Sequence, residues 1–414
     1  MTDTGVKVAI LGAGVAGLAL ALNLKKRGIE CRVYESAPEI KELGVGITLL
    51  PHATRELHEL GLLDEIRSLA IENVESCFFN RFGQLLYKEP RGKYAGYRFP
   101  EFGIHRGRLH MALYRAALAA LGPDAIIVNR QGVGIDQDER GATLHLRETT
   151  SGKMVEPVRA AAVIGCDGIN SVVRRQFYPD EQVAFAGINT WRGVTRRKPI
   201  LTGRSYMRIG SIRTGKIVVY PIIDNVDGEG NQLINWMAEI QSGAVEKNDW
   251  NKPGKLEDFL PIYEHWKFDW LDVGELIRTA DTVLEYPMVD KDPIAQWTFG
   301  RITFAGDAAH PMYPRGSNGA AQGLIDARTL ADILERQRDP LAALKEYEAK
   351  RLDATAKVVR TNREHPPDFI NIRVEELIGD KPYDDLDAVI TQSELRALSD
   401  QYKRVAGFAL EDVR

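Results

Sequence analysis

The first 35 residues carry a pattern of apolar and polar positions that predicts a strand, a helix and a second strand. The apolar run VAIL (8–11) is followed by glycines, by the helix-forming stretch LALALNLKKRG (18–28), and then by CRVYE (31–35). A short apolar run, a glycine turn and an apolar helix that stops at glycine are the signals of a βαβ unit. We therefore expect an α/β domain at the start of the chain.

Farther along, the pattern changes character twice. Helical periodicity predicts helices over 53–70 and 104–122, and alternation over 125–148 predicts a β-meander before another strand, glycine turn and helix at 161–177. Strands, turns and aromatic residues dominate 183–288, where five of the six tryptophans lie between Trp191 and Trp270. The α/β pattern resumes at 302, and the chain ends in helical sequence.

This order predicts an α/β fold, α+β overall, in which a Rossmann-like domain is interrupted by a β-sheet domain. The Rossmann-like domain is expected in three parts, 1–75, 101–182 and 289–345. Residues 76–100 would be an excursion into the sheet domain, 183–288 the sheet domain itself, and 346–414 a C-terminal helical segment.

Composition narrows the classes of partner. The 414 residues are 44% hydrophobic and 27% charged with a net charge of −4, and no basic stretch dominates, which argues against nucleic acid. No apolar run approaches the roughly 18 residues that span a bilayer, and the polar N-terminal lead is not a signal peptide. Cys31, Cys77 and Cys166 show no ligand spacing, so we expect no disulfide, no metal site, and a soluble cytoplasmic protein.

The first chemical motif is Gly12-x-Gly14-x-x-Gly17, placed after a predicted strand and at the start of a predicted helix. Such glycines allow a tight turn and bring a pyrophosphate to the helix N-terminus, whose amides favour anions. Glu35 ends the next strand, where a carboxylate can accept hydrogen bonds from a ribose that keeps its 2′-hydroxyl. We expect a nucleotide site here.

Two further turns carry carboxylates at strand ends. Asp167 lies in GCDG (165–168), where the alternative is a simple Asx turn. Asp307 is the second residue of the run GDAAHPMYPRGSNGAAQGLIDA (306–327), whose Ser317-Asn318-Gly319 precedes a helix expected near Ala320. The helix start would face a negatively charged group, with an ordinary N-cap as the alternative.

Together, GAGVAGL with Glu35, GCDGINSVVR and FAGDAAHPMYPRGSNGAAQGLIDA resemble the single-component FAD-dependent aromatic hydroxylases with the p-hydroxybenzoate hydroxylase fold. The motifs occur in the family's order over about residues 5–350. Stretches such as ELGVGI, IHRGRL, WRGVT and YPMVDKDP are similar to the branch that includes the 5-methylphenazine-1-carboxylate monooxygenases.

The resemblance implies a set of cofactor contacts. The glycine motif would approach the FAD pyrophosphate, Glu35 the adenosine ribose, and Asp307 the ribityl–pyrophosphate part. Arg108 would reach the phosphate and ribityl region, and Asp167 belongs to a motif implicated in binding both FAD and NAD(P)H. Gly319 and Ala320 would present amides to the pyrimidine edge of the flavin. The implied cofactor-binding residues are Gly12, Gly14, Ala16, Gly17, Glu35, Arg108, Asp167, Asp307, Gly319 and Ala320.

The same resemblance implies an NAD(P)H- and O2-dependent monooxygenase. Through a flavin hydroperoxide it would hydroxylate a phenazine- or hydroxybenzoate-like aromatic or heteroaromatic acid, with or without decarboxylation. Two alternatives remain: a same-fold FAD-dependent reductase, and a non-catalytic flavoprotein that binds an aromatic compound. The choice between NADH and NADPH, and between monomer and homodimer, stays open.

The substrate is expected between the flavin and the sheet domain. Candidate contacts are Thr48, Leu50, Arg208, Tyr220 and Tyr313, with Tyr220, Arg208 and Pro314 as candidate catalytic residues. Arg208 and Tyr220 flank a predicted hairpin turn, and related enzymes that act on heteroaromatic acids or urate hold the substrate with an Arg and a Tyr at this separation. A one-residue slip in strand register would move one of the two to the other face.

Overall fold

A seven-stranded sheet forms the core of the nucleotide-binding part of the chain. The computed structural model describes residues 6–241, 252–364, 366, 368–407 and 409–411. The sheet order is β8-β2-β1-β11-β10-β9, and β20 pairs with β11. Its strands are β1 (Val6–Leu11), β2 (Cys31–Tyr34), β8 (Ile126–Ile127), β9 (Gln131–Gln137), β10 (Ala142–Arg147), β11 (Val158–Gly165) and β20 (Ile302–Phe304). β1 runs parallel to β2 and β11, as the predicted βαβ unit requires.

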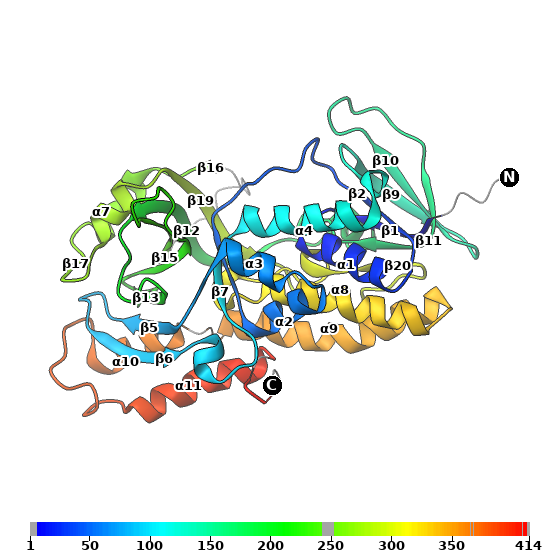
Figure 1. Cartoon of the computed structure of the whole chain (residues 1–414). Coiled ribbons are helices and arrows are strands. Elements are labelled where there is room, and N and C mark those ends of the chain that lie inside the picture. The colour runs from blue at the N-terminus through cyan, green and yellow to red at the C-terminus, as the bar shows by residue number, and fades with distance from the viewer. Residues whose placement is uncertain (1–5, 242–251, 365, 367, 408, 412–414) are drawn as a thin grey trace.

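Helices from distant parts of the chain pack together beside this sheet (Figure 1). They are α1 (Val15–Lys26), α2 (Pro51–Glu59), α3 (Leu63–Leu69), α4 (Arg106–Leu121), α5 (Val172–Phe177), α8 (Gly319–Arg336) and α9 (Pro340–Glu364). α1 lies against both α4 and α8, with Leu18, Leu20 and Leu24 fully buried. A domain division at 345/346 would cut α9, which is continuous from Pro340 to Glu364.

An eight-stranded sheet lies at the other end of the molecule, on the left in Figure 1. Its order is β16-β19-β12-β15-β14-β13-β5-β6, and every pairing is antiparallel except β5 with β13. The strands are β5 (Glu75–Phe79), β6 (Leu85–Pro90), β12 (Ala184–Arg197), β13 (Ser205–Ser211), β14 (Gly215–Ile223), β15 (Gln232–Gln241), β16 (Lys252–Pro253) and β19 (Thr282–Asp290).

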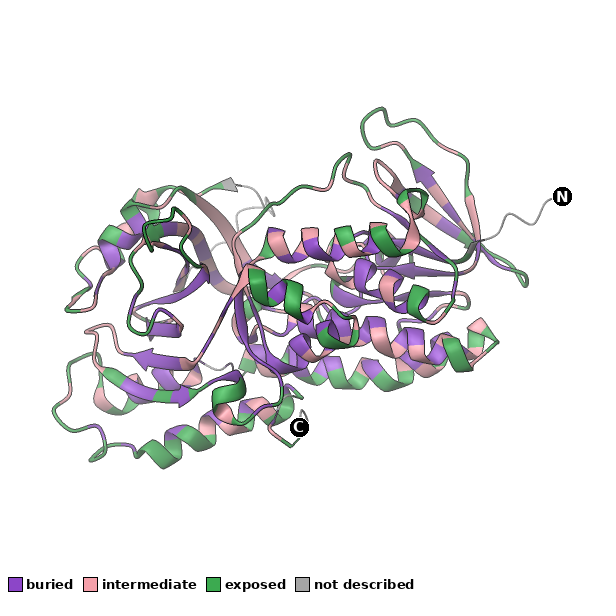
Figure 2. Ribbon diagram, viewed as in Figure 1, coloured by how far each residue is buried: buried purple, intermediate pink, exposed green. Residues whose placement is uncertain are grey.

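Apolar side chains form a core against one face of this sheet. Trp191, Trp236 and Ile217 pack there with residues of α6 (Leu260–Tyr263) and α7 (Val273–Arg278), beside the small hairpin β17 (Lys267–Phe268) and β18 (Leu271–Asp272). Trp236 is fully buried in this core. Figure 2 shows how far buried residues dominate the strands of this sheet.

A three-stranded sheet and the C-terminal helices complete the fold. β3 (Gly46–Leu49), β7 (Phe102–His105) and β4 (Ala70–Glu72) pair in the order β3-β7-β4, and β7 approaches β14 closely, since a Cβ on Gly103 would lie 2.5 Å from the carbonyl oxygen of Pro221. α10 (Phe369–Ile378) and α11 (Gln392–Val405) cover β5 and β6 through a cluster that includes Phe78 and Leu395. Within the described residues, no helix is both long and apolar enough to cross a membrane.

Candidate active site

The three glycines of the first motif differ in their surroundings. Gly12 has φ +105°, and a Cβ there would lie 2.4 Å from the carbonyl oxygen of Cys166. A Cβ on Gly17 would lie 2.0 Å from the carbonyl oxygen of Gly12, so these two glycines permit strand and helix to touch. Gly14, in contrast, meets nothing within 4 Å and is exposed just before α1. Gly14 is therefore where a phosphate can approach the free amides of the helix.

The carboxylate of Glu35 contacts the same loop. Glu35 follows β2, and its two oxygens accept hydrogen bonds from the amides of Ala13 and Ala37, both at 2.7 Å. His110 of α4 lies 2.6 Å from the carbonyl oxygen of Ala13 through Nε2, a contact that the sequence did not indicate. Arg108, two residues nearer the start of α4, is one-third exposed, with Nε 3.5 Å from Glu42. A ribose hydroxyl can reach this cluster of acceptors.

Ala16 and Asp167 sit at the edges of the loop. Ala16 packs on α8 and on the turn after β20, since a Cβ on Gly306 would lie 2.8 Å from the Ala16 methyl group. Asp167 accepts a hydrogen bond from the amide of Val172 at 2.7 Å through Oδ2, five residues along the chain, whereas an Asx turn would bond the amide two residues along. Its Oδ1 is buried with no partner among the described residues, and burial raises the pKa of the carboxyl. That orphaned oxygen can take a donor from a ligand.

Asp307 and the start of α8 face the same space. Asp307 lies in the short 3₁₀ turn η4 (Gly306–Ala308) and is exposed, whereas Gly306 and Ala308 are buried. A Cβ on Gly319 would meet only Asp307 Oδ1 at 3.9 Å and Met312 Cγ at 4.0 Å, so the first turn of α8 is open. The Asn318 side chain does not cap the helix, which leaves its first amides for a ligand. These residues fit FAD.

A buried ion network anchors the turn that carries Asp307. His310, which the sequence left unassigned, lies 2.5 Å from Asp326 Oδ2 through Nε2, and the amide of Gly306 donates to the same oxygen at 2.9 Å. Arg351 of α9 donates to Asp326 Oδ1 at 2.7 Å. Burial alone would raise the pKa of Asp326, but His310 and Arg351 outweigh it and lower the pKa. The turn is therefore fixed to both α8 and α9.

A second buried network holds the residues before α8. Asn318 donates from Nδ2 to Tyr402 Oη at 2.8 Å, and its Oδ1 lies 3.0 Å from His52 Nε2. The hydroxyl of Tyr402 in turn donates to Asn362 at 2.8 Å. A Cβ on Gly316 would lie 1.5 Å from Tyr402 Oη, so this glycine lets α11 press on the loop. Burial lowers the pKa of His52 to about 3, which keeps it neutral.

Arg315, also unassigned from the sequence, ties the loop to the eight-stranded sheet. It donates to Asp368 at 2.7 Å, and Asp368 also lies 3.1 Å from Lys216. Lys216 pairs with Glu239 on the neighbouring strand at 2.8 Å. Although burial would raise it, the pKa of Asp368 is held well below its usual range by Lys216 and Arg315. This network joins the predicted cofactor loop to β14 and β15.

The strand register places Arg208 and Tyr220 on the same face of the sheet. Arg208 is opposite Val218 in the β13–β14 pair, so Tyr220, two residues on, lies on the same face as Arg208. Tyr220 stacks on Tyr206 with ring centroids 4.9 Å apart, and the Arg208 guanidinium lies 4.5 Å from the centroid of Tyr206. Thr48 lies beside the Tyr220 hydroxyl, and burial raises the pKa of Tyr220.

A cavity opens beside Arg208. Of the predicted substrate residues, Arg208 and Leu50 line it. The other lining residues are Phe78, Glu89, Arg91, Gly316, Ser317, Ser399, Tyr402 and Lys403. Tyr313 is buried elsewhere, in a cluster with Ile188 and Met288, and Pro314 is exposed. The sequence did not indicate that α11 supplies part of the wall.

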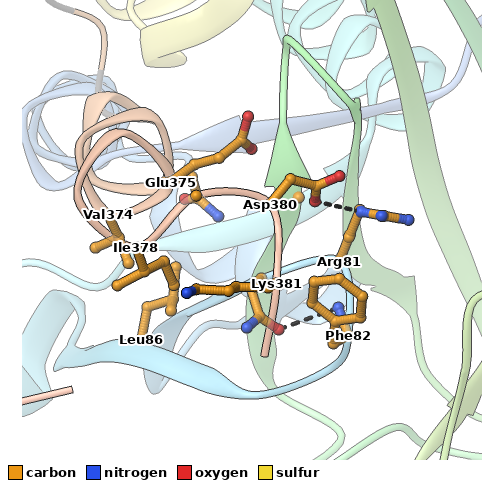
Figure 3. A pocket seen from close by; sticks show the side chains of 12 residues that line it. Arg81, Phe82, Leu86, Val374, Glu375, Ile378, Asp380 and Lys381 are labelled. Atoms are coloured by element: carbon orange, nitrogen blue, oxygen red, sulfur yellow. Dashed lines mark hydrogen bonds and ion pairs between the residues drawn. The ribbon is translucent and has the colours of Figure 1, made fainter. Parts of the chain in front are cut away.

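A second hollow lies between the β5–β6 turn and α10 (Figure 3). Arg81 and Asp380 form an ion pair at its edge, and Val374 and Ile378 of α10 lie on another side. None of the predicted site residues lines this hollow. It is therefore separate from the candidate active site.

Comparison with known proteins agrees with this geometry. Residues 5–206 and 287–362 match the family model described as FAD binding domain. The chain is 39% identical to the phenazine 1,6-dicarboxylic acid hydroxylase of Lysobacter antibioticus, over 88% of this chain and 90% of that protein. It is 33% identical to a 3-amino-4-hydroxybenzoate 2-monooxygenase of Streptomyces platensis, over 88% of both.

A solved structure shares the fold. The complex of Klebsiella pneumoniae HpxO with FAD and uric acid has a TM-score of 0.75 and 21% identity, and the match covers 100% of this chain and 98% of that one. The chain belongs to the FAD binding domain family. Within that family it is an FAD-dependent aromatic monooxygenase, which confirms the resemblance drawn from its motifs.

Proposed function

We propose that this enzyme uses NAD(P)H and O2 to hydroxylate an aromatic or heteroaromatic carboxylic acid of the phenazine or hydroxybenzoate type, with or without loss of the carboxyl group. The observation that carries the proposal is Arg208, a buried cation that lines the cavity and has no ion pair among the described residues. A buried charge is stabilised by an opposite charge, and an acid substrate supplies one. The two relatives named above act, by their names, on aromatic carboxylic acids.

In this proposal, FAD bound at the glycine loop and α8 supplies the redox chemistry. The open amides at Gly14 and the acceptors of Glu35 hold the adenosine half of the cofactor. Asp307 binds ribityl hydroxyls, and the start of α8 at Gly319 and Ala320 presents amides and a positive dipole to the pyrimidine edge. That end of α8 would stabilise negative charge on the bound group. We assign Arg108 and Asp167 to the phosphate side of the site.

On the substrate side, Arg208 would hold the carboxylate while its own position is fixed by Ser76, whose hydroxyl accepts from Nη1 at 2.8 Å. Tyr220 and Thr48 would hydrogen-bond a ring substituent and so set the orientation of the ring. Leu50 and Phe78 exclude water from one side of the cavity. Tyr313 and Pro314 would act by shaping the loop. We also retain a cytoplasmic location as part of the proposal.

The test is a screen of aromatic acids for stimulation of NADH and NADPH oxidation by the FAD-loaded enzyme, with mass spectrometry of the product. The proposal predicts stimulated oxidation and a product that gains one oxygen, or gains one oxygen and loses the carboxyl group. A product that gains only hydrogen would indicate the reductase. Tight binding without stimulated oxidation would indicate a non-catalytic aromatic-binding flavoprotein.

A further inference from the structure

Ser317, shortly before α8, has a backbone conformation that is unusual for its residue type. It ends the short 3₁₀ turn η5 (Pro314–Gly316) with φ +55° and ψ +29°, in the left-handed region that glycine adopts most easily. Gly316 and Gly319 lie close by on either side, and neither has a positive φ. A serine therefore stands at the position of this turn where glycine would remove backbone strain.

The neighbours of Ser317 hold this conformation in place. Arg315, two residues earlier, donates to Asp368 at 2.7 Å. A Cβ on Gly316 would lie 1.5 Å from Tyr402 Oη, so Gly316 packs directly against α11. Asn318 donates to the carbonyl oxygen of Gly316 at 3.1 Å as well as to Tyr402. Strained backbone persists where such contacts over-determine it, and it is concentrated at sites that bind ligands.

The other non-glycine residues with positive φ in the described part of the chain have simpler explanations. Asn129 and Asn225 belong to the residue type that tolerates this conformation best, and hydrogen bonds engage both side chains. Leu201 lies in a turn and is 43% exposed. None of these three residues lines the cavity beside Arg208, whereas Ser317 does.

The hydroxyl of Ser317 is free to bind a ligand. It makes no hydrogen bond with any residue that the structure describes. Another serine of the cavity wall, Ser399, already donates to Glu89 at 2.8 Å, and Lys403 lies 2.8 Å from the same carboxylate. Arg208 donates to Ser76 through Nη1 and keeps further N–H donors. Ser317 and Arg208 therefore offer the cavity donors that its other polar side chains have already used.

We propose that Ser317 is a substrate-binding residue, whose left-handed backbone holds the hydroxyl in the cavity so that it donates a hydrogen bond to an acceptor atom of the aromatic acid held by Arg208. Glycine at this position would relieve the strain but would present no donor. The strain is retained because it places a donor at this point of the wall. This inference rests on the proposed function and adds a residue to that same site.

The test compares the wild type with Ser317→Gly and Ser317→Ala, which both lack the hydroxyl, although only glycine relieves the strain. Binding of phenazine-1-carboxylate and of 3-amino-4-hydroxybenzoate to the FAD-loaded enzymes is measured by calorimetry, together with FAD affinity and the midpoint of urea unfolding. Both variants should bind each acid that the wild type binds about 10-fold more weakly, with FAD affinity within about threefold of wild type. The urea midpoint of Ser317→Gly should be at least that of the wild type and above that of Ser317→Ala.

Leu201→Gly is the matched control, because it removes the same kind of strain away from the cavity and should leave acid binding unchanged. Three results would overturn the inference. They are unchanged acid affinity in both Ser317 variants, full acid binding by Ser317→Gly with weak binding by Ser317→Ala, and a fall in FAD affinity as large as the fall in acid affinity. Failure of the proposed function is distinguishable, since it would appear as no stimulated NAD(P)H oxidation by the wild type with any acid.

Discussion

His52 offers a quantitative test of how the loop before α8 is held. Its ring is fully buried and in contact with Asn318, and burial lowers its pKa from 6.5 to about 3. Because Asn318 Nδ2 donates to Tyr402 and to the carbonyl oxygen of Gly316, its Oδ1 accepts, so His52 carries its proton on Nε2. A second proton on this ring would place a charge in the buried network.

The sign of the pH effect follows from linkage. The unfolded chain binds a proton at His52 below pH 6.5, but the folded chain does not until about pH 3, so lower pH favours unfolding. One pKa unit corresponds to about 1.4 kcal/mol. Between pH 7 and pH 5, His52 should therefore remove about 2 kcal/mol of the free energy of unfolding.

The assay is urea denaturation of FAD-loaded protein at several pH values between 7 and 5, for the wild type and His52→Gln. Glutamine can donate to Asn318 but does not titrate, so the variant should lose about 2 kcal/mol less than the wild type over this range. The other histidines contribute equally to both proteins. Equal losses in the two proteins would refute the assignment of His52 as a buried neutral group.

Three further predictions concern the cofactor. In Gly14→Ala, the added methyl group meets no other atom of the protein, so the urea midpoint of the apoprotein should not change. FAD affinity should nevertheless fall about 10- to 100-fold, because the methyl group would occupy the space where the pyrophosphate approaches. Unchanged affinity would place the pyrophosphate elsewhere. Asp307→Ala should purify largely free of FAD, measured by the flavin-to-protein absorbance ratio, and a full flavin content would contradict its role. Tyr402→Phe removes the hydrogen bonds to Asn318 and Asn362, so it should lower the free energy of unfolding by about 1–3 kcal/mol and speed the release of FAD. An unchanged rate of FAD release would mean that α11 does not position the loop.

Local features of the fold could be predicted from the sequence. The βαβ unit follows from an apolar run, glycines and a helical stretch that all lie within 30 residues or so. The hairpin that carries Arg208 and Tyr220 could also be predicted, but the register of its two strands could not. That depended on which residues face each other across β13 and β14.

The long-range contacts of the site could not be predicted. His310 and Arg315 had no assigned role, because their partners Asp326 and Asp368 are 16 and 53 residues farther along the chain. That α11 forms part of the cavity wall could not be predicted for the same reason. Its Ser399 donates to Glu89, 310 residues earlier, and an amphipathic pattern does not say which surface a helix covers.

The most direct test of the central claim, that this chain is an FAD-dependent aromatic monooxygenase, is the fate of labelled oxygen. The enzyme is loaded with FAD and incubated with NAD(P)H and the best stimulating aromatic acid under ¹⁸O2, and the product is analysed by mass spectrometry. The account predicts that one ¹⁸O atom enters each product molecule. NAD(P)H consumption with no ¹⁸O in the product would contradict it.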